Sequence, residues 1–242
     1  MSTLIAHASI DERGKASGGM AGDQSKKEVC IREWYSKPWS YVIRFTDMKM
    51  AEKVAQAMEA AAKNNNIGYN QNKRNTLLSE ARKHNYNISK VNVPCDTDCS
   101  ALVSVACMFA GVPESALTLQ GNCANTRNIR QMLKSTGEVE IYTTSLYTAK
   151  TEKLKRGDIL LKEGSHVVVV VQNDITIILK KGSKGENVEW LQYELNKHGY
   201  GLEVDGSFGA ETEAAVKDFQ KRNNLVVDGI VGKNTFGKLK AV

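Results

Sequence analysis

The chain has 242 residues, of which 41% are hydrophobic and 25% charged, and its formal net charge is +6. This composition excludes a disordered acidic protein and a fibrous repeat, and the length suits a catalytic domain followed by a small accessory module. No stretch approaches the roughly 18 apolar residues of a membrane-spanning helix. The positive charge suggests an anionic partner: nucleic acid, a membrane surface or a cell-wall polymer.

The positive charge belongs to the long N-terminal part of the chain. Residues 1–181 contain 25 Lys and Arg against 18 Asp and Glu, a net +7, whereas residues 182–242 contain 8 against 9, a net −1. The basic residues are scattered, and few aromatic residues lie among them, so a nucleic-acid groove is only weakly signalled. A solvated lysine-rich surface is the simpler interpretation.

The N-terminus and the five cysteines bear on the compartment. Residues 1–10 lack the basic start and apolar core of a secretion signal, which predicts cytoplasmic synthesis without a signal peptide. The number of cysteines is odd, no Cys-x-x-Cys pair occurs, and thiols made in a cytoplasm stay reduced. Each cysteine is interpreted as a small buried hydrophobe or a reactive thiol, and no metal or other cofactor is expected.

Taken in chain order, the pattern predicts helices first and an antiparallel sheet afterwards. A glycine-rich stretch of irregular sequence precedes the first helical pattern, and β-branched runs dominate up to residue 179. Asn173-Asp174 is typical of a hairpin turn. This order favours an α+β domain. The predicted strands are 3–7, 40–45, 139–143, 158–161, 166–171 and 175–179, and the predicted helices are 47–63, 72–84, 98–110 and 125–133.

A short polar segment, residues 180–186, is the predicted linker to a second domain. Beyond it, Val204-Asp205-Gly206 recurs as Val227-Asp228-Gly229, each followed by a threonine and an apolar helical stripe. This repeat predicts a compact three-helix unit, in which the two aspartates form turns rather than bind metal. The predicted domains are 1–181, with 1–46 as an N-terminal extension, and 182–242.

Cys99 is the residue best placed for covalent chemistry. It follows Asp98 and opens a strongly apolar predicted helix, so its thiol meets the positive end of the helix dipole. Unpaired N–H groups there could also hold the oxyanion of a tetrahedral intermediate. A buried cysteine behind an Asp N-cap accounts for the same pattern without catalysis, and position alone favours neither interpretation.

A thiol nucleophile needs a base, and His166 is the best placed of the four histidines. It begins the β-branched strand after Gly164-Ser165, where its imidazole can face a helix N-terminus. His84 and His198 lie at helix ends. His7 is the second candidate, because a short N-terminal strand could line the same cleft.

At this point the sequence resembles a known family. Three segments are similar, in order and spacing, to the Asp-Cys-Ser-Gly helix start, the Gly-Asp strand and the His strand of NlpC-type cell-wall peptidases of the papain-like superfamily. They are Asp98-Cys99-Ser100-Ala101, Arg156-Gly157-Asp158-Ile159 and His166-Val167-Val168-Val169. The resemblance covers residues 65–180 and implies a papain-like fold in which Cys99 and His166 are catalytic and Asp98 and Ser100 contact substrate. Ala101 departs from the family's glycine.

The resemblance also implies a tyrosine before the nucleophile and a polar third catalytic residue on the strand after His166. Gly68-Tyr69 matches the former, so Tyr69 is a predicted substrate contact. The predicted strand 175–179 offers only Thr176, and Asn173 in the turn is therefore the assigned third residue. The alternatives are Gln172, a backbone carbonyl group and Asp23-Gln24. Residues 1–46 resemble an addition seen in clostridial phage lysins and receive no role.

The C-terminal repeat resembles the three-helix peptidoglycan-binding domain, with Trp190, Tyr193 and Tyr200 as candidate contacts or core residues. Together the resemblances imply a monomeric endolysin that cleaves an amide bond of the stem peptide through a Cys–His mechanism. Its partner would be the peptidoglycan of a Gram-positive cell wall, reached after release through a separate pore, with neither nucleic acid nor membrane as partner. Three alternatives stay open: a papain-like N-acetylmuramoyl-L-alanine amidase, a zinc amidase using His7, His166 and an acid, and a non-catalytic wall-binding protein.

Overall fold

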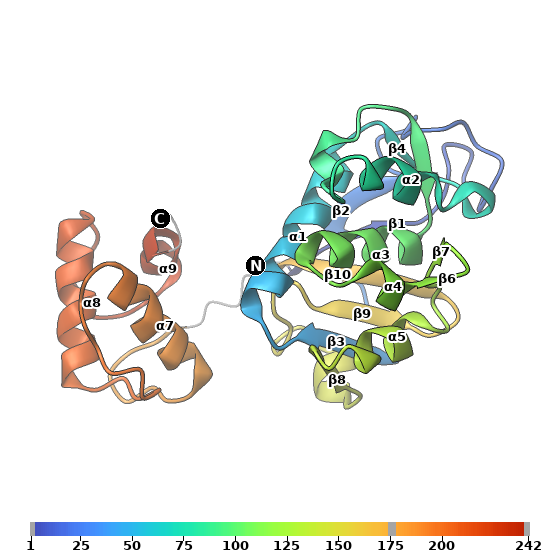
Figure 1. Ribbon diagram of the computed structural model, residues 1–242. Coiled ribbons are helices and arrows are strands. Elements are labelled where there is room, and N and C mark those ends of the chain that lie inside the picture. The colour runs from blue at the N-terminus through green and yellow to red at the C-terminus, as the bar shows by residue number, and fades with distance from the viewer. Residues whose placement is uncertain (1–2, 174–177, 240–242) are drawn as a thin grey trace. The chain divides into compact units, whose positions relative to one another are not determined.

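The computed structural model describes residues 3–173 and 178–239. The chain divides into two compact units, residues 1–174 and 175–242 (Figure 1). Among the described residues, no helix has the length and apolar character needed to cross a membrane.

The first unit is built on a six-stranded antiparallel sheet. Its strands are β1 (Thr3–Ala8), β2 (Val29–Glu33), β3 (Tyr41–Phe45), β8 (Val139–Tyr142), β9 (Ile159–Lys162) and β10 (His166–Asn173). Their order across the sheet is β2-β1-β10-β9-β3-β8. The N-terminal strand β1 therefore pairs with the last strand of the unit, β10, and all neighbours run antiparallel.

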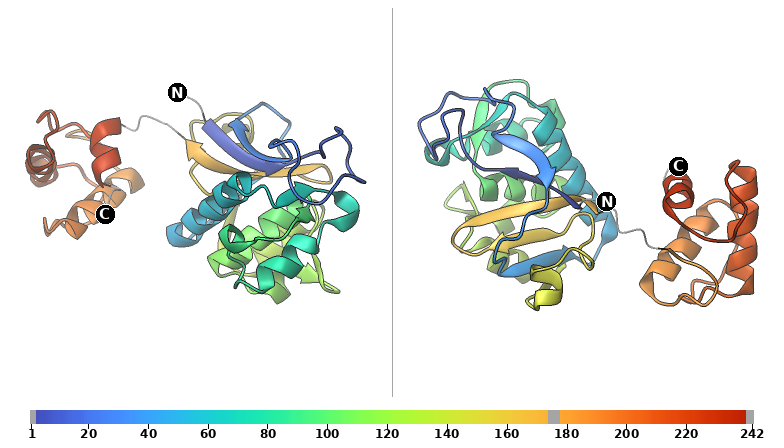
Figure 2. Two further views of the ribbon diagram at one scale, coloured as in Figure 1. Left: turned by 90° about the horizontal axis from the view of Figure 1, so that it is seen from above. Right: turned by 180° about the vertical axis from the view of Figure 1, so that it is seen from behind.

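Helices cover one face of this sheet (Figure 2). They are α1 (Met48–Lys63), α2 (Thr76–Arg82), α3 (Cys99–Ala110), α4 (Glu114–Leu117) and α5 (Ile129–Ser135). Helix α1 begins at the N-cap Asp47, whose side chain accepts from the Lys49 N–H. Helix α3 is buried along nearly its whole length and packs against α1 and β10. A helix buried on all sides needs the near absence of polar residues that its sequence shows.

Short elements complete the unit. They are β4 (Ile67–Tyr69) paired in parallel with β5 (Cys95–Thr97), the hairpin β6 (Thr118–Leu119) and β7 (Asn122–Cys123), helix α6 (Ser145–Thr148), and the single 3-10 turns η1 (Gln71–Lys73) and η2 (Ile88–Lys90). Strand β5 leads directly into α3, so the pairing with β4 fixes the place where that helix starts.

The β-branched run of β10 is buried on both faces of the sheet. Val167, Val169 and Val171 belong to the core under the helices, whereas Val168 and Val170 belong to a second core on the opposite face. Alternate side chains of a strand point to opposite faces, and a strand covered on both sides reads as a continuous apolar run.

Most of the predicted strand 175–179 falls on residues 174–177, which lie outside the described residues. Leu179, which is described, pairs with Val231 in the second unit. The position beside β10 is filled by β1 instead, with Ala6 opposite Val169 and Ile5 opposite Val170.

The N-terminal residues, left without a role by the sequence, are integrated into the first unit. Glu28 is 1% exposed, and its carboxylate accepts from the backbone N–H of Tyr69 at 2.9 Å and of Gln24 at 2.9 Å. A Cβ atom on Gly68 would lie 2.3 Å from the Gly22 carbonyl oxygen. The loop between β1 and β2 thus rests directly on β4, and only glycine leaves room for it.

The Gly-Asp motif before β9 has a structural explanation. Gly157 has φ +88°, and a Cβ atom there would lie 2.3 Å from the Ala51 carbonyl oxygen of α1. Asp158 is 1% exposed and accepts two 2.7 Å hydrogen bonds from Arg44 of β3. The glycine allows α1 to approach, and the aspartate holds the neighbouring strand.

The second unit contains three helices, α7 (Glu186–Lys197), α8 (Ala210–Arg222) and α9 (Lys233–Leu239). Its core includes Val188, Leu191, Phe208, Phe219 and Val231. The predicted linker 180–186 is part of this unit, because the Gly182 N–H donates to Phe208 O and the Gly185 N–H to Gly206 O.

The internal repeat is stabilised by two buried glutamines that the sequence pattern did not reveal. The Gln192 amide donates to Asp205 at 2.7 Å and accepts from the Gly206 N–H at 3.0 Å. Gln220 makes the same contacts with Asp228 (2.8 Å) and Gly229 (2.9 Å) in the second copy. The turn-forming role predicted for the two aspartates is confirmed, since each accepts from the N–H two residues on.

Candidate functional site

Cys99 is the first residue of α3. The preceding Asp98 is extended (φ −117°, ψ −179°) and caps the helix by accepting from the Ala101 N–H at 2.7 Å. Arg74 holds this cap through bonds of 2.5 and 3.1 Å to the Asp98 carboxylate and one of 3.0 Å to the Ser100 hydroxyl. Asp98 and Ser100, predicted as substrate contacts, are both buried in this network.

The Cys99 thiol is 6% exposed and lies against the start of β10. Burial raises its pKa to about 12 and the Asp98 charge adds to this, while the Val167 backbone, Arg74 and the Ser100 backbone act in the opposite direction. The Val167 contact places the sulfur next to the residue that follows His166. In the resting protein this cysteine is therefore a thiol, which needs a base to become nucleophilic.

His166 and His7 form a buried pair. Nε2 of His166 lies 3.1 Å from Nδ1 of His7, and the rings meet edge to face with centroids 5.3 Å apart. Burial, the neighbouring His7 and Lys37 lower the pKa of His166 to about 3. Burial, Arg32 and Lys37 lower the pKa of His7 to about 4. Both imidazoles are consequently neutral at pH 7.

The contact between the two rings occupies one nitrogen of each imidazole. Nε2 of His166 is engaged by Nδ1 of His7, so Nδ1 of His166 takes no part in this contact. For Nδ1 to accept a proton, Nε2 must carry its own and donate it to Nδ1 of His7. His7 must then be neutral with its proton on Nε2, which its lowered pKa favours.

Asn173, the predicted third catalytic residue, lies at the other end of β10. Its side chain donates to the carbonyl oxygens of Thr151 (2.9 Å) and Leu154 (2.5 Å) and accepts from the Thr3 hydroxyl at 2.5 Å. A strand rises about 3.3 Å per residue, which puts Asn173 about 23 Å from His166. Asn173 therefore does not meet the imidazole of His166, whereas His7 does.

The other proposed orienting residues are engaged elsewhere. The Asp23 carboxylate accepts from backbone N–H groups of its own loop, at Ser25 (3.1 Å) and Lys27 (3.2 Å). The Gln24 amide donates to Ala21 O at 2.9 Å. Both stabilise the loop that covers β4 and do not meet the imidazole pair.

Aromatic side chains surround the site. Trp39 is 4% exposed and stacks on His166 with ring centroids 6.4 Å apart, and Tyr35 lies 6.5 Å from the His7 ring. Tyr69 is buried, and its hydroxyl accepts from Gln71 at 3.1 Å. Burial and the nearby Cys99 raise the pKa of Tyr69 to about 12, so Tyr69 lies near Cys99.

Metal binding finds little support in this geometry. Within residues 3–173 and 178–239, no three His, Cys, Asp or Glu side chains come close enough together to hold a metal ion. His7 and His166 face each other through ring nitrogens, which leaves those two atoms directed away from a shared ligand position.

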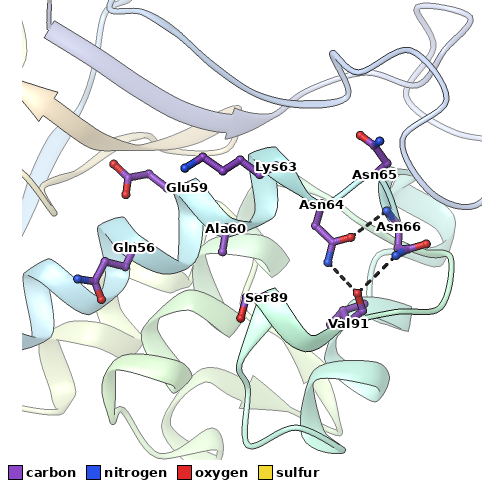
Figure 3. Close-up of a pocket in the computed structure, with 9 residues that line it drawn as sticks. All are labelled: Gln56, Glu59, Ala60, Lys63, Asn64, Asn65, Asn66, Ser89 and Val91. Atoms are coloured by element: carbon purple, nitrogen blue, oxygen red, sulfur yellow. Dashed lines mark hydrogen bonds between the residues drawn. The ribbon is translucent and has the colours of Figure 1, made fainter.

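A hollow of about 690 Å³ lies at the C-terminal end of α1 (Figure 3). Its lining is polar and includes Gln56, Lys63, Asn65 and Ser89, while Asn64 and Asn66 both donate to the Val91 carbonyl oxygen. None of its lining residues belongs to the Cys99–His166–His7 group.

In the second unit, the three candidate aromatic contacts differ in exposure. Trp190 packs on the core and stacks on Phe236 with centroids 5.0 Å apart. The Tyr200 hydroxyl donates to Asp218 at 3.0 Å. Tyr193 is 46% exposed, with the Lys197 ammonium over its ring. Only Tyr193 of the three presents much of its side chain to solvent.

Comparison with known families agrees with the division of the chain into two units. Residues 5–176 match the family described as "Endolysin-like domain". The chain belongs to the endolysin-like domain family. Residues 184–239 match a second family, described as "Putative peptidoglycan binding domain". The endolysin-like match begins within β1, so His7 lies inside the family's domain together with Cys99 and His166.

Curated relatives share only a short stretch with this endolysin-like chain. The autolytic lysozyme of Clostridium acetobutylicum is 46% identical over 71 residues, 28% of this chain and 21% of its own. The zinc D-Ala-D-Ala carboxypeptidase of Streptomyces albus G is 44% identical over 64 residues, 25% of each chain. The chain thus spans a quarter or less of their length, and matches this short cannot cover the endolysin-like domain.

One solved structure covers more of the chain. A peptidoglycan-binding protein from Clostridioides difficile, in complex with glutamine hydroxamate, is 26% identical and covers 70% of this chain and 86% of its own, with a TM-score of 0.27. At that TM-score the likeness says nothing about the fold.

Sequence reasoning proposed Cys99 and His166, which lie at the α3 N-terminus and the start of β10, and Asn173, which lies at the other end of β10. Cys99 carries a local signal, since an N-cap and an apolar helix surround it, and His166 opens a β-branched strand. His7 was proposed only as an alternative base. Its signal was its position on a short strand-like run, and nothing in the chain order shows that this strand pairs with β10.

Proposed function

We propose that this protein is a peptidoglycan hydrolase in which Cys99 attacks an amide carbonyl, His166 acts as its base and His7 orients His166. The observation that carries the proposal is the 3.1 Å contact between the two imidazoles at the strand end that meets the α3 N-terminus. The contact pairs a base, His166, with an orienting group, His7, next to the proposed nucleophile Cys99. Thiol catalysis requires these three parts. The same arrangement supports a papain-like domain, as the NlpC-type resemblance implies.

The reaction would follow from these positions. Nδ1 of His166 takes the Cys99 proton while the sulfur attacks the carbonyl carbon, and the tetrahedral oxyanion is held by N–H groups at the α3 N-terminus. The C–N bond then breaks, and the imidazolium gives its proton to the leaving amine. Water hydrolyses the thioester to a carboxylic acid and restores the thiol. Nδ1 of His7 accepts a hydrogen bond from the Nε2–H of His166 throughout, and this bond keeps the His166 ring in orientation.

The second unit would hold the enzyme on its substrate. Its family match supports peptidoglycan as the partner, and its near-neutral charge suggests that shape and hydrogen bonds dominate its binding. The net +7 of the first 181 residues would suit an anionic Gram-positive wall, where a monomer would act after its release from the cytoplasm.

The test is clearing of purified cell walls followed by identification of the products. Wild type should clear walls and Cys99→Ala should not, although Cys99→Ala should still sediment with them. A chelator should leave the rate unchanged, whereas loss of activity in chelator would favour a zinc amidase. Clearing by Cys99→Ala, or no clearing by wild type, would contradict the proposal.

The products decide which bond is cleaved. New amino groups on the third residue of the stem peptide would identify an endopeptidase. Free L-alanine amino groups would identify an N-acetylmuramoyl-L-alanine amidase, the second candidate. The site geometry suits either reaction, because both break an amide through the same thioester.

A further inference from the structure

Two cations act on the histidine pair, Arg32 on β2 and Lys37 on the segment that joins β2 to β3. Arg32 is on β2 opposite Ile5, two residues from Cys30, which lies opposite His7. Cross-strand partners point to the same face of a sheet, so Arg32 shares the His7 face. The Arg32 guanidinium carbon lies 4.9 Å from the Tyr35 ring centroid, and that ring lies 6.5 Å from His7.

Lys37 lies between Tyr35 and Trp39 in the sequence. The ring centroids of these two residues are 5.8 Å apart, and Trp39 stacks on His166. The charge of Lys37 lowers the pKa of both imidazoles, and the charge of Arg32 also lowers the pKa of His7. Arg32 is exposed and Lys37 half-buried, so both can be reached from solvent.

These cations differ from three half-buried arginines of the same unit. Arg44, Arg74 and Arg156 each have a carboxylate partner. Within the part of the chain that the structure describes, neither Arg32 nor Lys37 forms an ion pair. Their charges oppose the imidazolium that forms on His166 during the proposed reaction, and only an incoming anion would offset them.

We propose that Arg32 and Lys37 bind a carboxylate of the peptidoglycan stem peptide and hold it beside the His7–His166 pair. This rests on the proposed function. A guanidinium over an aromatic ring still presents its N–H groups at its edge, and a lysine adds a second point charge for the same anion. The bound carboxylate neutralises the two cations, so the correct substrate makes His166 a stronger base as it binds.

The test compares two preparations of the same walls, stripped of teichoic acid. One is left untreated, and in the other the peptide carboxyl groups are converted to amides with carbodiimide and ammonia. Rates are measured at about 0.5 M salt, where screening removes long-range attraction. Wild type should clear untreated walls about tenfold faster than amidated walls, which corresponds to about 1.4 kcal/mol.

Four variants sharpen the comparison. The double variant Arg32→Gln/Lys37→Gln should bring the rate ratio close to one by losing rate on untreated walls. The charge-conserving pair Arg32→Lys/Lys37→Arg should keep most of the ratio. Lys53→Gln, an exposed charge on α1, is the matched control, and Cys99→Ala gives the background. Circular dichroism and melting temperature establish that each variant is folded.

The pH profile gives a second readout. Removing both cations should move the acid limb of kcat/KM to higher pH, because two causes of the low His7 pKa disappear. A shifted limb with an unchanged rate ratio would overturn the proposal, since the cations would then tune the histidines without binding substrate. A ratio of one in wild type would overturn it too. Clearing by Cys99→Ala, by contrast, would refute the proposed function itself.

Discussion

The two sides of the candidate site have different origins in the sequence. The nucleophile side is local: Asp98 caps α3, Cys99 opens it, and contacts within a few residues create the environment of the thiol. The histidine side is non-local, because His7 and His166 are 159 positions apart and meet only when β1 pairs with β10. A helix start can be recognised in any short window of sequence, but a strand pairing cannot.

This difference shows where the catalytic geometry is vulnerable. A one-residue slip in the pairing of β1 would turn His7 to the other face of the sheet, into the core under the helices. The bulge between Leu4 and Ile5 and the buried Glu28, which ties the following loop to β4, both fix that pairing. The N-terminal residues therefore help to place His7 in the candidate site.

The largest expected effect separates His7 from Asn173. His7→Ala should lower kcat/KM on cell walls by roughly 10²–10⁴-fold, because His166 loses the group that fixes its tautomer and orientation. Asn173→Ala should keep the catalytic rate and lose stability, since it leaves the Thr151 and Leu154 carbonyl groups without their donor. Initial clearing rates and urea unfolding measure the two effects.

The opposite result would contradict the orienting role of His7. If Asn173→Ala were inactive yet folded, and His7→Ala active, the orienting role would return to the end of β10. His7→Gln and His7→Asn serve as intermediate variants, because the amide oxygen can accept a hydrogen bond from the Nε2–H of His166 but does not titrate.

The second largest effect concerns Asp158, which belongs to the Gly-Asp motif that resembles the NlpC-type family. Asp158→Asn should cost about 3–5 kcal/mol of unfolding free energy, because Arg44 would stay buried without its charge partner. Glu80→Gln, which removes an exposed pair with Lys83, should cost less than about 1 kcal/mol. A stable but inactive Asp158→Asn protein would show that the motif acts in catalysis and not in the scaffold.

Much of the first unit was predictable because its signals are local. The helices 47–63 and 98–110 and the β-branched strand at His166 were found from periodicity and caps, and the repeat identified the three-helix unit. The strand β2 was missed, since Val29–Glu33 carries charges at an exposed edge and has little alternation. Asn173 was proposed as the third residue because the strand beside β10 was sought forward in the chain, whereas β1 from the N-terminus pairs with β10.

A smaller effect is expected where the N-terminal loop rests on β4. Gly68→Ala would bring a methyl group to 2.3 Å from the Gly22 carbonyl oxygen, and we expect a loss of about 1–3 kcal/mol. Gly209 is the matched control, because a methyl group there meets no atom within 4 Å and its φ is −85°. Denaturant unfolding measures both. Equal stability of Gly68→Ala and wild type would mean that the loop can withdraw from β4 without cost.

The smallest expected change is in the pH dependence of catalysis. A base with the ordinary histidine pKa of 6.5 would lose about tenfold in kcat/KM between pH 7.5 and 5.5. Burial lowers the pKa of His166 to about 3 and of His7 to about 4, so both stay neutral over that range and the rate should change by less than about twofold.

The same pKa shifts determine the direction in which stability changes with pH. Between pH 6.5 and 4 the two histidines bind protons in the unfolded chain but stay neutral in the folded protein, so the free energy of unfolding falls as the pH falls through this window. His7→Gln should make that decrease smaller, because it removes one of the two histidines with a lowered pKa. Initial clearing rates at low wall concentration and melting temperatures across pH 4–8 measure both effects, and an acid limb centred near pH 6.5 would show that the two imidazoles are open to water.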